Sequence, residues 1–416
     1  MEERFFPITF WNYNVLRQFG PDEIAVWKDL GITVGMVPRF KMSDTEAVEI
    51  IKEYLKEAER LGGIKLLLWV EDMTLYDYGL LGEEKFREKF TQAYNTFKSP
   101  ALYGFFAGDE PNERHTFEGT KAVVRIEKEI APELDPYINF GIDLDKRIER
   151  CYPEITFDEW MKDFCKQTNL KHFCYGHYDQ MVDEKGVDSH FRNLKATSEV
   201  AEKYGVEFWL TALSSAHYMF RIPTEYELLW QITTSVACGC KGISWFRLHD
   251  RWHSPANYHG SPIDEYGNKG ETYIRMLHAN RHFHDEYGSF VMGLKRKETY
   301  FTKHAYSGYT TLPYGKHHVI QTVRSTENGI VSFFEDENGT EYLVMVNASM
   351  EKAGVFRPEF DRDKYTLTEI RKNDKEMCIY GRRTTYDHYD AGHTEDHWDG
   401  IWLYPGQLTI YRIGEK

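Results

Sequence analysis

Two adjacent acids follow an apolar run in the segment "LYGFFAGDEPNERH", which begins at Leu102. The acids are Asp109 and Glu110, and Pro111 comes next. Two carboxyl groups can share the cleavage of a glycosidic bond: a protonated one donates to the leaving oxygen, and an ionised one attacks or activates water. A negative Asp109 would raise the pKa of Glu110 through like-charge repulsion, and partial burial would add to that; a raised pKa suits a proton donor near neutral pH. We therefore expect Glu110 to act as the donor.

A structural role is the alternative for these acids, in which one of them caps the following helix or pairs with Arg114. Their position decides between the two interpretations. Adjacent residues of a strand point to opposite sides, so one acid can face the interior of a sheet layer while the other turns toward the next strand. The elements around the pair must therefore be identified first.

The chain has 416 residues, of which 41% are hydrophobic and 15% aromatic, enough for more than one domain. Its formal net charge of -15 argues against nucleic acid or an anionic membrane as a partner. No signal peptide or membrane-spanning run is evident. The six cysteines lack the spacing of a disulfide framework, so we expect free thiols in a reducing cytoplasm. The sequence implies no cofactor.

The first 295 residues alternate between short β-rich apolar runs and charged segments with helical periodicity. The apolar runs lie at residues 8–14, 32–37, 64–70, 102–108, 136–141, 171–178, 206–213 and 241–246. Eight strand-then-helix units in succession predict a (β/α)8 barrel. A doubly wound open sheet is the competitor, but the first turn, "WNYNVLRQFG", lacks the glycines of a phosphate-binding turn.

From residue 296 onward the pattern becomes an alternation of apolar and polar residues with Asn-Gly turns, for example at Asn338-Gly339. This pattern predicts an antiparallel β-sandwich. The expected domains are thus a barrel at residues 1–295 and a sandwich at residues 296–416.

In such barrels the chemistry lies at the C-terminal ends of the strands. Acidic, aromatic and hydroxyl-binding side chains gather at these ends, a combination typical of a sugar-binding site. The expected substrate is a carbohydrate. The candidate contacts to it are Asn12, Arg39, Trp69, Asp109, His177, Tyr178, His217, Trp245, Arg247, His249 and Asp250.

The motif "GDEPN" resembles the Asn-Glu-Pro signature of clan A glycoside hydrolases, whose glutamate is the acid/base. Glu110 matches that glutamate, and Asp109 stands where the family has asparagine. The chain is also similar to β-galactosidase-like barrel proteins of gut bacteria in "YGHYDQ" at the sixth strand and in "GIWLYPGQLTIYRI" near the C-terminus. The resemblance touches both domains and implies a barrel glycosidase with a C-terminal sandwich.

The seventh strand departs from that family, which places a nucleophilic glutamate at its end. Here the end reads "TALSSAHY", without a carboxylate. Either the strand alignment slips, or the second carboxylate comes from elsewhere, or the chain does not hydrolyse by that mechanism. Asp179 is the first substitute, and Asp250, Glu71 and Asp72 follow.

Two other functions stay open. His249, Asp250 and His253 contain metal-ligating atoms, which allows a metal-dependent barrel hydrolase. The absent carboxylate allows a carbohydrate-binding protein on a glycosidase scaffold that has lost hydrolysis. A serine triad at Ser214, Ser215 and His217 is disfavoured because no Gly-x-Ser-x-Gly turn is present.

Overall fold

A computed structural model describes residues 5–182, 184–373, 375–380 and 400–416. The chain divides into two compact units. The barrel unit comprises residues 7–223 and 240–280, and the sandwich unit comprises residues 224–239 and 281–416 with the N-terminal residues up to Phe6. The domain boundary between residues 295 and 296 stays a prediction.

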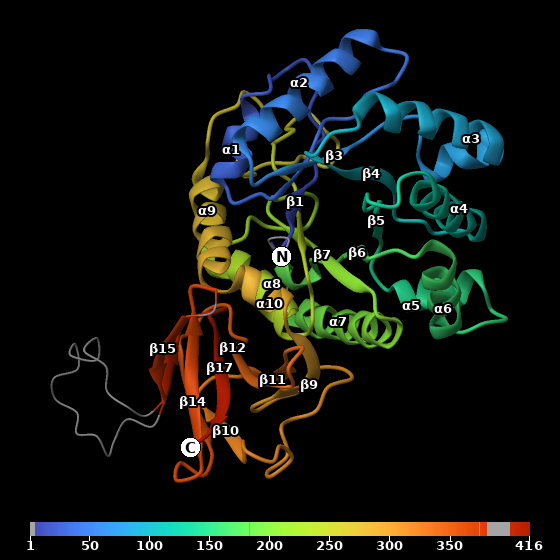
Figure 1. Cartoon of the computed structure of the whole chain (residues 1–416). Coiled ribbons are helices and arrows are strands. Elements are labelled where there is room, and N and C mark those ends of the chain that lie inside the picture. Colours follow the sequence, from blue (N-terminus) through green and yellow to red (C-terminus); the bar gives the residue numbers. More distant parts are fainter. Residues whose placement is uncertain (1–4, 183, 374, 381–399) are drawn as a thin grey trace. The chain divides into compact units, whose positions relative to one another are not determined.

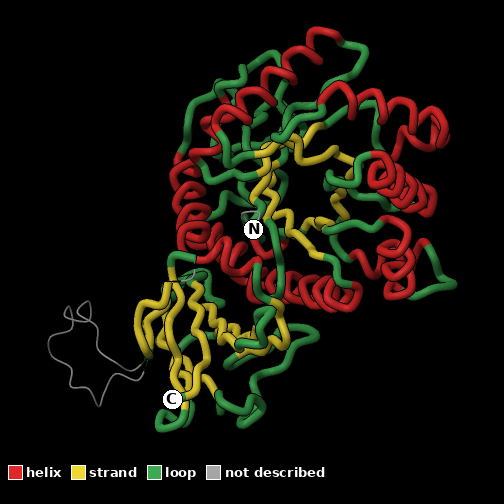
Figure 2. The backbone as a smooth tube through the Cα atoms, viewed as in Figure 1, coloured by secondary structure: helices red, strands yellow, loops and turns green. Residues whose placement is uncertain are grey.

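The barrel unit contains eight parallel strands in the order β1-β8-β7-β6-β5-β4-β3-β2. Thr33 closes the ring, because its N–H donates to the Ile8 carbonyl (3.0 Å) and its hydroxyl accepts from the Ile8 N–H (2.9 Å). The predicted (β/α)8 barrel is confirmed (Figures 1 and 2). The strands are β1 (Ile8–Phe10), β2 (Val34–Met36), β3 (Lys65–Leu68), β4 (Leu102–Asp109), β5 (Tyr137–Phe140), β6 (His172–Gly176), β7 (Glu207–Leu213) and β8 (Ile243–Phe246).

Helices follow the strands along the chain, with two of them between β5 and β6. They are α1 (Glu23–Asp29), α2 (Thr45–Leu61), α3 (Leu75–Phe97), α4 (Arg114–Ile130), α5 (Leu144–Cys151), α6 (Phe157–Thr168), α7 (Glu184–Tyr204), α8 (Glu225–Ala237), α9 (Glu271–Phe283) and α10 (Ser289–Met292). Short turns of 3₁₀ and π helix lie at Asp179–Met181 and His284–Gly288. Among the described residues, no helix is both long enough and apolar enough to cross a membrane.

Helix α2 illustrates how the sequence determines these elements. Its buried residues recur at helical spacing, so they form one stripe on an otherwise polar helix. The Asp44 carboxylate accepts from the Ala47 N–H and caps its first turn. The helix ends at Gly62, which has φ 59°.

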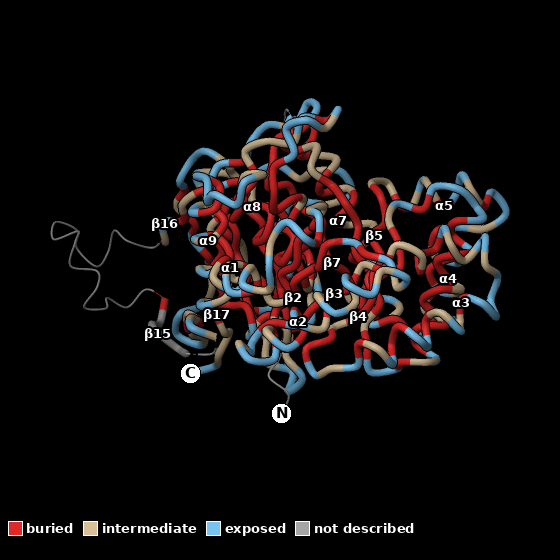
Figure 3. The backbone as a smooth tube through the Cα atoms, turned by 90° about the horizontal axis from the view of Figure 1, so that it is seen from above, coloured by how far each residue is buried: buried red, intermediate tan, exposed pale blue. Residues whose placement is uncertain are grey.

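Aromatic side chains fill the barrel interior. The ring of Trp11 lies 5.6 Å from that of Phe106 and 6.0 Å from that of Tyr137 between ring centres. The buried Tyr137 hydroxyl donates to Ser244 Oγ on β8 (2.9 Å). The buried residues coincide with the barrel strands in Figure 3. The strands read as continuous apolar runs because both of their faces are buried.

The sandwich unit contains two antiparallel sheets with a common apolar core, as predicted. One sheet has the order β10-β13-β16 and the other the order β15-β14-β17-β12-β11-β9. The strands are β9 (Lys295–Phe301), β10 (Thr322–Ser325), β11 (Gly329–Glu335), β12 (Glu341–Asn347), β13 (Gly354–Glu359), β14 (Tyr365–Arg371), β15 (Lys375–Ile379), β16 (Ile401–Leu403) and β17 (Leu408–Glu415). Val323, Phe356 and Leu403 of the small sheet share the core with residues of the large sheet.

Helix α8 packs against the large sheet of the sandwich unit. The Trp230 indole donates to the Ala348 carbonyl (2.8 Å), and the Ser332 hydroxyl donates to the Ala237 carbonyl (2.8 Å). Strand β11 is therefore buried at six successive positions, Gly329 to Phe334, instead of alternating between buried and exposed residues.

Gly104 on β4 tests the packing of the barrel. A Cβ at this position would lie 2.1 Å from the Asp135 backbone oxygen, which cannot move aside as a flexible side chain would. We expect Gly104→Ala to destabilise the protein by about 1–3 kcal/mol in urea denaturation. The control is Gly79→Ala in α3, where nothing lies within 4 Å. Because alanine favours helix, this variant should be neutral or more stable, and equal stabilities of both variants would contradict the packing argument.

Candidate active site

Strand β4 carries one extra residue just before its two acids. Phe106 pairs with Tyr137 on β5, but the next pair is Gly108 with Ile138, so Ala107 has no partner in the ladder. Without this bulge the alternation starting from Phe106 would turn Asp109 away from the interior. With it, Asp109 pairs with Asn139 and shares the interior face of the barrel.

Asn139 on β5 holds both acids in place. Its side-chain N–H donates to Asp109 Oδ1 (2.8 Å), and its backbone carbonyl accepts from the Glu110 N–H (2.8 Å). Its side-chain oxygen accepts from the Thr211 hydroxyl on β7 (2.9 Å). Sequence reasoning missed Asn139, although an amide inside the apolar run "PYINFG" is a signal that could have identified it.

Asp109 carries the perturbed carboxyl of the pair. The sequence predicted a raised pKa for Glu110, but the structure gives it to Asp109: burial, together with the neighbouring charge of Glu110, raises the pKa of Asp109 to about 7. The hydrogen bond from Asn139 and the charge of Arg147 act in the opposite direction. A carboxyl group with this pKa can hold or release a proton near neutral pH.

Glu110 stands at the mouth of the barrel. Its backbone has φ 39°, and 48% of its side chain is exposed. The Arg147 Nη1 atom lies 3.8 Å from its Oε2 atom. The structural alternative for the pair is not observed, because the cap of α4 is Glu113 and Arg114 pairs with Glu154 (2.6 Å).

Partly exposed aromatic rings lie near the two acids. Burial raises the pKa of the Tyr178 phenol, and the charges of Glu110 and Asp109 raise it further, which places both acids close to this ring. Tyr178 stacks on Phe246, with ring centres 5.9 Å apart and planes 14° apart. Such rings can pack against the faces of a sugar. Phe246 was not among the residues selected from the sequence.

Trp69 and His217 extend this aromatic cluster. The ring of Tyr13 lies 5.4 Å from that of Trp69. The ring of His217 lies 5.1 Å from that of Phe246 and 5.3 Å from that of Tyr258. Burial lowers the pKa of His217, which favours its neutral form. The structure therefore brings two of the predicted contacts together with Tyr13 and Tyr258, which sequence reasoning missed.

Arg247 follows β8 directly and is only 2% exposed. Its guanidinium carbon lies 4.7 Å from the ring centre of Tyr13 and 4.6 Å from that of Tyr258. Burial lowers its pKa to about 10. The charges of Arg247 and Asp109 both act on the Tyr13 phenol, so Tyr13 links the arginine to the acids of β4.

Asp179 and His177 follow β6. The side chain of Asp179 is 45% exposed, and its Oδ2 atom lies 4.0 Å from the Nε2 atom of the buried His177. The His177 ring also contacts the Gln180 side chain (3.2 Å) and the Ser189 hydroxyl (3.0 Å). The charge of Asp179 contributes to the raised pKa of the Tyr178 phenol, as does the larger effect of Glu110.

Several predicted contacts have partners inside the protein instead. Asn12 is fully buried, and its amide donates to the Met36 carbonyl (3.0 Å). The Trp245 indole, also fully buried, donates to Asn280 on α9 (3.1 Å). These bonds give both residues a structural role, and the proposal below does not use them as sugar contacts.

The remaining predicted contacts are likewise occupied by neighbours. The Nε2 atom of His249 lies 3.2 Å from Glu23 Oε1. Asp250 accepts from the Ser261 N–H (2.7 Å). The exposed Arg39 pairs with Glu71 (3.3 Å).

The end of β7 carries no carboxylate. This strand ends at Leu213, and the buried Ser214 and Ser215 follow it. The observed strand agrees with the predicted run at residues 206–213, so a slipped strand alignment does not explain the missing glutamate.

Metal-ligating side chains do not gather at β8. In the described part of the chain, one group of three or more places its ligand atoms within 4.8 Å of one another, and it comprises His317, His318 and Glu341. His249, Asp250 and His253 form no such group, and this weakens the metal-dependent alternative.

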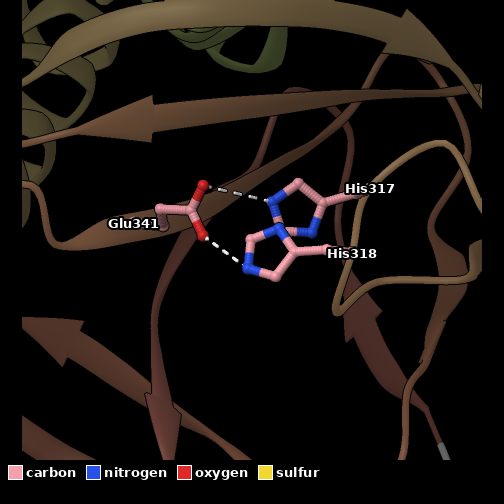
Figure 4. Close-up of side chains that lie close together, drawn as sticks. All are labelled: His317, His318 and Glu341. Carbon is pink, nitrogen blue, oxygen red and sulfur yellow. Dashed lines mark ion pairs between the residues drawn. The ribbon is translucent and has the colours of Figure 1, made fainter.

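The histidine group belongs to the sandwich unit (Figure 4). Glu341 lies 3.6 Å from the Nε2 atom of His317 and 3.1 Å from that of His318. The Nδ1 atom of His317 accepts from the N–H groups of Val319 and Ile320 (3.2 Å each). The Nε2 atom of His317, which faces Glu341, therefore carries a proton in the neutral as well as in the charged ring, so it presents an N–H to the carboxylate and no lone pair to a metal.

Comparison with solved structures supports the fold. A catalytic mutant of a GH42 β-galactosidase from G. stearothermophilus matches with a TM-score of 0.60 at 10% identity, over 100% of this chain and 99% of that chain. A family 5 glycoside hydrolase from Bacteroides vulgatus matches with a TM-score of 0.54 at 12% identity, over 99% and 89%. A β-galactosidase from Rahnella sp. R3 gives 0.54 at 12%, over 71% of this chain and 58% of that one.

No protein-family model and no curated protein matches the sequence. The structural matches define the class of fold: a glycoside hydrolase barrel followed by antiparallel sheets. The predicted resemblance to clan A enzymes in fold is confirmed. At 10–12% identity these matches carry the fold alone.

Asp109→Asn tests the raised pKa of Asp109. The folded protein keeps this proton up to a pH of about 7, whereas the unfolded chain releases it near the ordinary aspartate pKa of 3.8. The wild type therefore loses stability as the pH rises from about 4 to about 7. Asparagine can accept the same bond from Asn139 without a charge, so the variant should unfold at a higher temperature at pH 8.

The difference should be on the order of 1 kcal/mol, because the partial exposure of Asp109 reduces the cost of its charge. It should shrink toward pH 5. Thermal unfolding of both proteins at several pH values measures it. A difference that does not change with pH would contradict the raised pKa.

Proposed function

We propose that the protein is a glycoside hydrolase with Glu110 as the proton donor. The observation that carries the proposal is the acid pair at the end of β4, which Asn139 fixes beside partly exposed aromatic rings. Carboxyl groups supply the acid–base chemistry of glycosidic cleavage, and the rings supply faces for a sugar. The carbohydrate substrate and a cytoplasmic location are part of this proposal.

Asp109 and Glu110 act as a pair in this mechanism. The raised pKa of Asp109 means that the pair retains one proton up to a pH of about 7. Glu110 has the more exposed side chain, so it is the member that can reach a leaving oxygen. When Glu110 carries the proton of the pair, Asp109 carries the negative charge, and when Glu110 has donated its proton, Asp109 can hold a proton instead.

Asp179 is the proposed partner carboxylate. Its side chain is partly exposed, three residues after the end of β6. Its charge acts on the Tyr178 phenol, as does that of Glu110. The charges of the two carboxylates thus act on one phenol. Asp250 is less suitable because it is buried and accepts from the Ser261 N–H.

A carbohydrate-binding protein without hydrolysis is the second candidate. The specific observation in its favour is the end of β7, where Ser214 and Ser215 stand in place of a carboxylate. This candidate uses the same aromatic rings and differs only in the absence of turnover.

Glu110→Gln tests the proposed donor with a panel of aryl glycosides. Glutamine preserves the shape of the side chain but cannot donate an acidic proton, so kcat should fall by about 10²–10⁴-fold. The loss should be greater for poor leaving groups, which need protonation most. The matched control is Glu84→Gln on the exposed face of α3, which should retain wild-type rates.

The same panel contains the opposing result. If Glu110→Gln turns over every active substrate at the wild-type rate, Glu110 is not the donor. If neither protein hydrolyses any glycoside but both bind glycans, the protein is the non-hydrolytic binder.

The pH profile tests the pairing of the two acids. Because the pair loses its last proton at a pH of about 7, kcat/KM of the wild type should fall above that pH. In Asp109→Asn the second carboxyl that helps to retain the proton is absent, so this limb should move to lower pH. An unchanged limb would show that Asp109 does not share the proton.

A further inference from the structure

Arg247 carries a charge that the protein itself leaves uncompensated. The residue is 2% exposed, and its Nε atom is buried without a hydrogen-bond partner among the described residues. Its side-chain contacts are with the ring faces of Tyr13 and Tyr258. An aromatic face attracts the cation but accepts none of its five N–H groups in the way that an oxygen does.

The surrounding acids do not pair with this guanidinium. No described carboxylate lies within ion-pair distance of it, and the nearby Asp250 accepts from the Ser261 N–H (2.7 Å). Removing a guanidinium from water without a partner is costly, because buried charges are normally paired and hydrogen-bonded. The guanidinium of Arg247 therefore lacks a hydrogen-bonded anionic partner within the described part of the chain.

Its place in the fold connects it to the candidate site. Arg247 directly follows β8, at the same end of the barrel as the acid pair of β4. The guanidinium contacts the half-buried Tyr13 ring, and the charges of both Arg247 and Asp109 act on the Tyr13 phenol. A sugar held near Glu110 would extend over this ring toward Arg247.

We propose that Arg247 binds an oxyanion carried by the substrate, and that this group is the carboxylate of a hexuronic acid. The guanidinium offers parallel N–H groups in one plane, which match the two oxygens of a carboxylate. A sulfate ester shares the oxyanion chemistry and is the other source. The inference rests on the proposed function, since it assigns the substrate class of the same site.

Binding of matched neutral and acidic sugars tests the proposal without requiring turnover. The probes are the α- and β-methyl glycosides of glucuronic acid, glucose, galacturonic acid and galactose, together with 6-sulfated galactose. We expect calorimetry on the wild type to show about tenfold to hundredfold tighter binding of a uronide than of its hexoside, because charged hydrogen bonds are then satisfied. Equal binding of both, or preference for the hexoside, would overturn the proposal.

Two variants of Arg247 assign the preference to this residue. Arg247→Gln removes the charge, and Arg247→Lys retains it but loses the planar pair of donors. Both should lose most of the preference for the uronide. Arg251→Gln is the control, because it removes an exposed positive charge four residues further along the chain and should keep the preference. Circular dichroism identifies folded variants, and a folded Arg247→Gln protein with the full preference would overturn the assignment.

The outcomes separate this inference from the proposed function. Hydrolysis of aryl hexosides and aryl uronides at equal rates would leave the glycosidase intact and overturn the role of Arg247. Tight binding of a uronide without hydrolysis of any aryl glycoside would support Arg247 and remove the glycosidase. A preference for 6-sulfated galactose over all uronides would support the oxyanion site but replace the carboxylate with a sulfate. Absence of binding to all probes would overturn the proposal.

Discussion

The side chain of Asn139 is the interaction on which the candidate site depends. Its amide joins strand β5 to Asp109 of β4 and to Thr211 of β7, and its backbone carbonyl holds the Glu110 N–H. A buried amide must satisfy its donors and acceptors, so this side chain has little freedom to move. The two acids are therefore positioned by the interior of the barrel and not only by the loop that follows them. Preorganisation of this kind is what acid–base chemistry needs.

The sequence determines the barrel through features that are local and repeated. Parallel strands buried on both faces require short apolar runs, and the helices between them require an apolar stripe, as in α2. Eight successive strand-then-helix units favour a closed barrel over an open parallel sheet. The large sheet that packs against α8 could not be predicted in this way. A helix that is buried on every side must be covered, but its sequence does not identify the element that covers it.

The candidate site was less predictable because its geometry depends on single residues. A position at the end of a strand was enough to select Glu110, Tyr178 and Arg247. It does not decide to which side of the strand a residue points. Trp245 faces Asn280 on α9, although it lies on the strand that precedes Arg247. The unpaired Ala107 changes which face of the strand the following residues occupy, just before the acids. The position of that bulge was not predicted from the run "LYGFFAGD".

The opposite charges of Asp109 and Arg247 at this end of the barrel do not form an ion pair, and both act on the Tyr13 phenol. Had Asp109 and Arg247 formed an ion pair, each would have stabilised the charged form of the other, which would lower the pKa of Asp109 and raise that of Arg247. Instead burial raises the pKa of Asp109 to about 7 and lowers that of Arg247 to about 10. Both groups bear the cost of burial without forming an ion pair with each other; the hydrogen bond from Asn139 offsets part of that cost at Asp109, whereas no described carboxylate pairs with Arg247. A ligand that presents an oxyanion to Arg247 would supply the partner that this guanidinium lacks. If Arg247 binds the substrate as proposed, its unpaired guanidinium is the physical reason for which an acidic sugar would fit this barrel better than a neutral one.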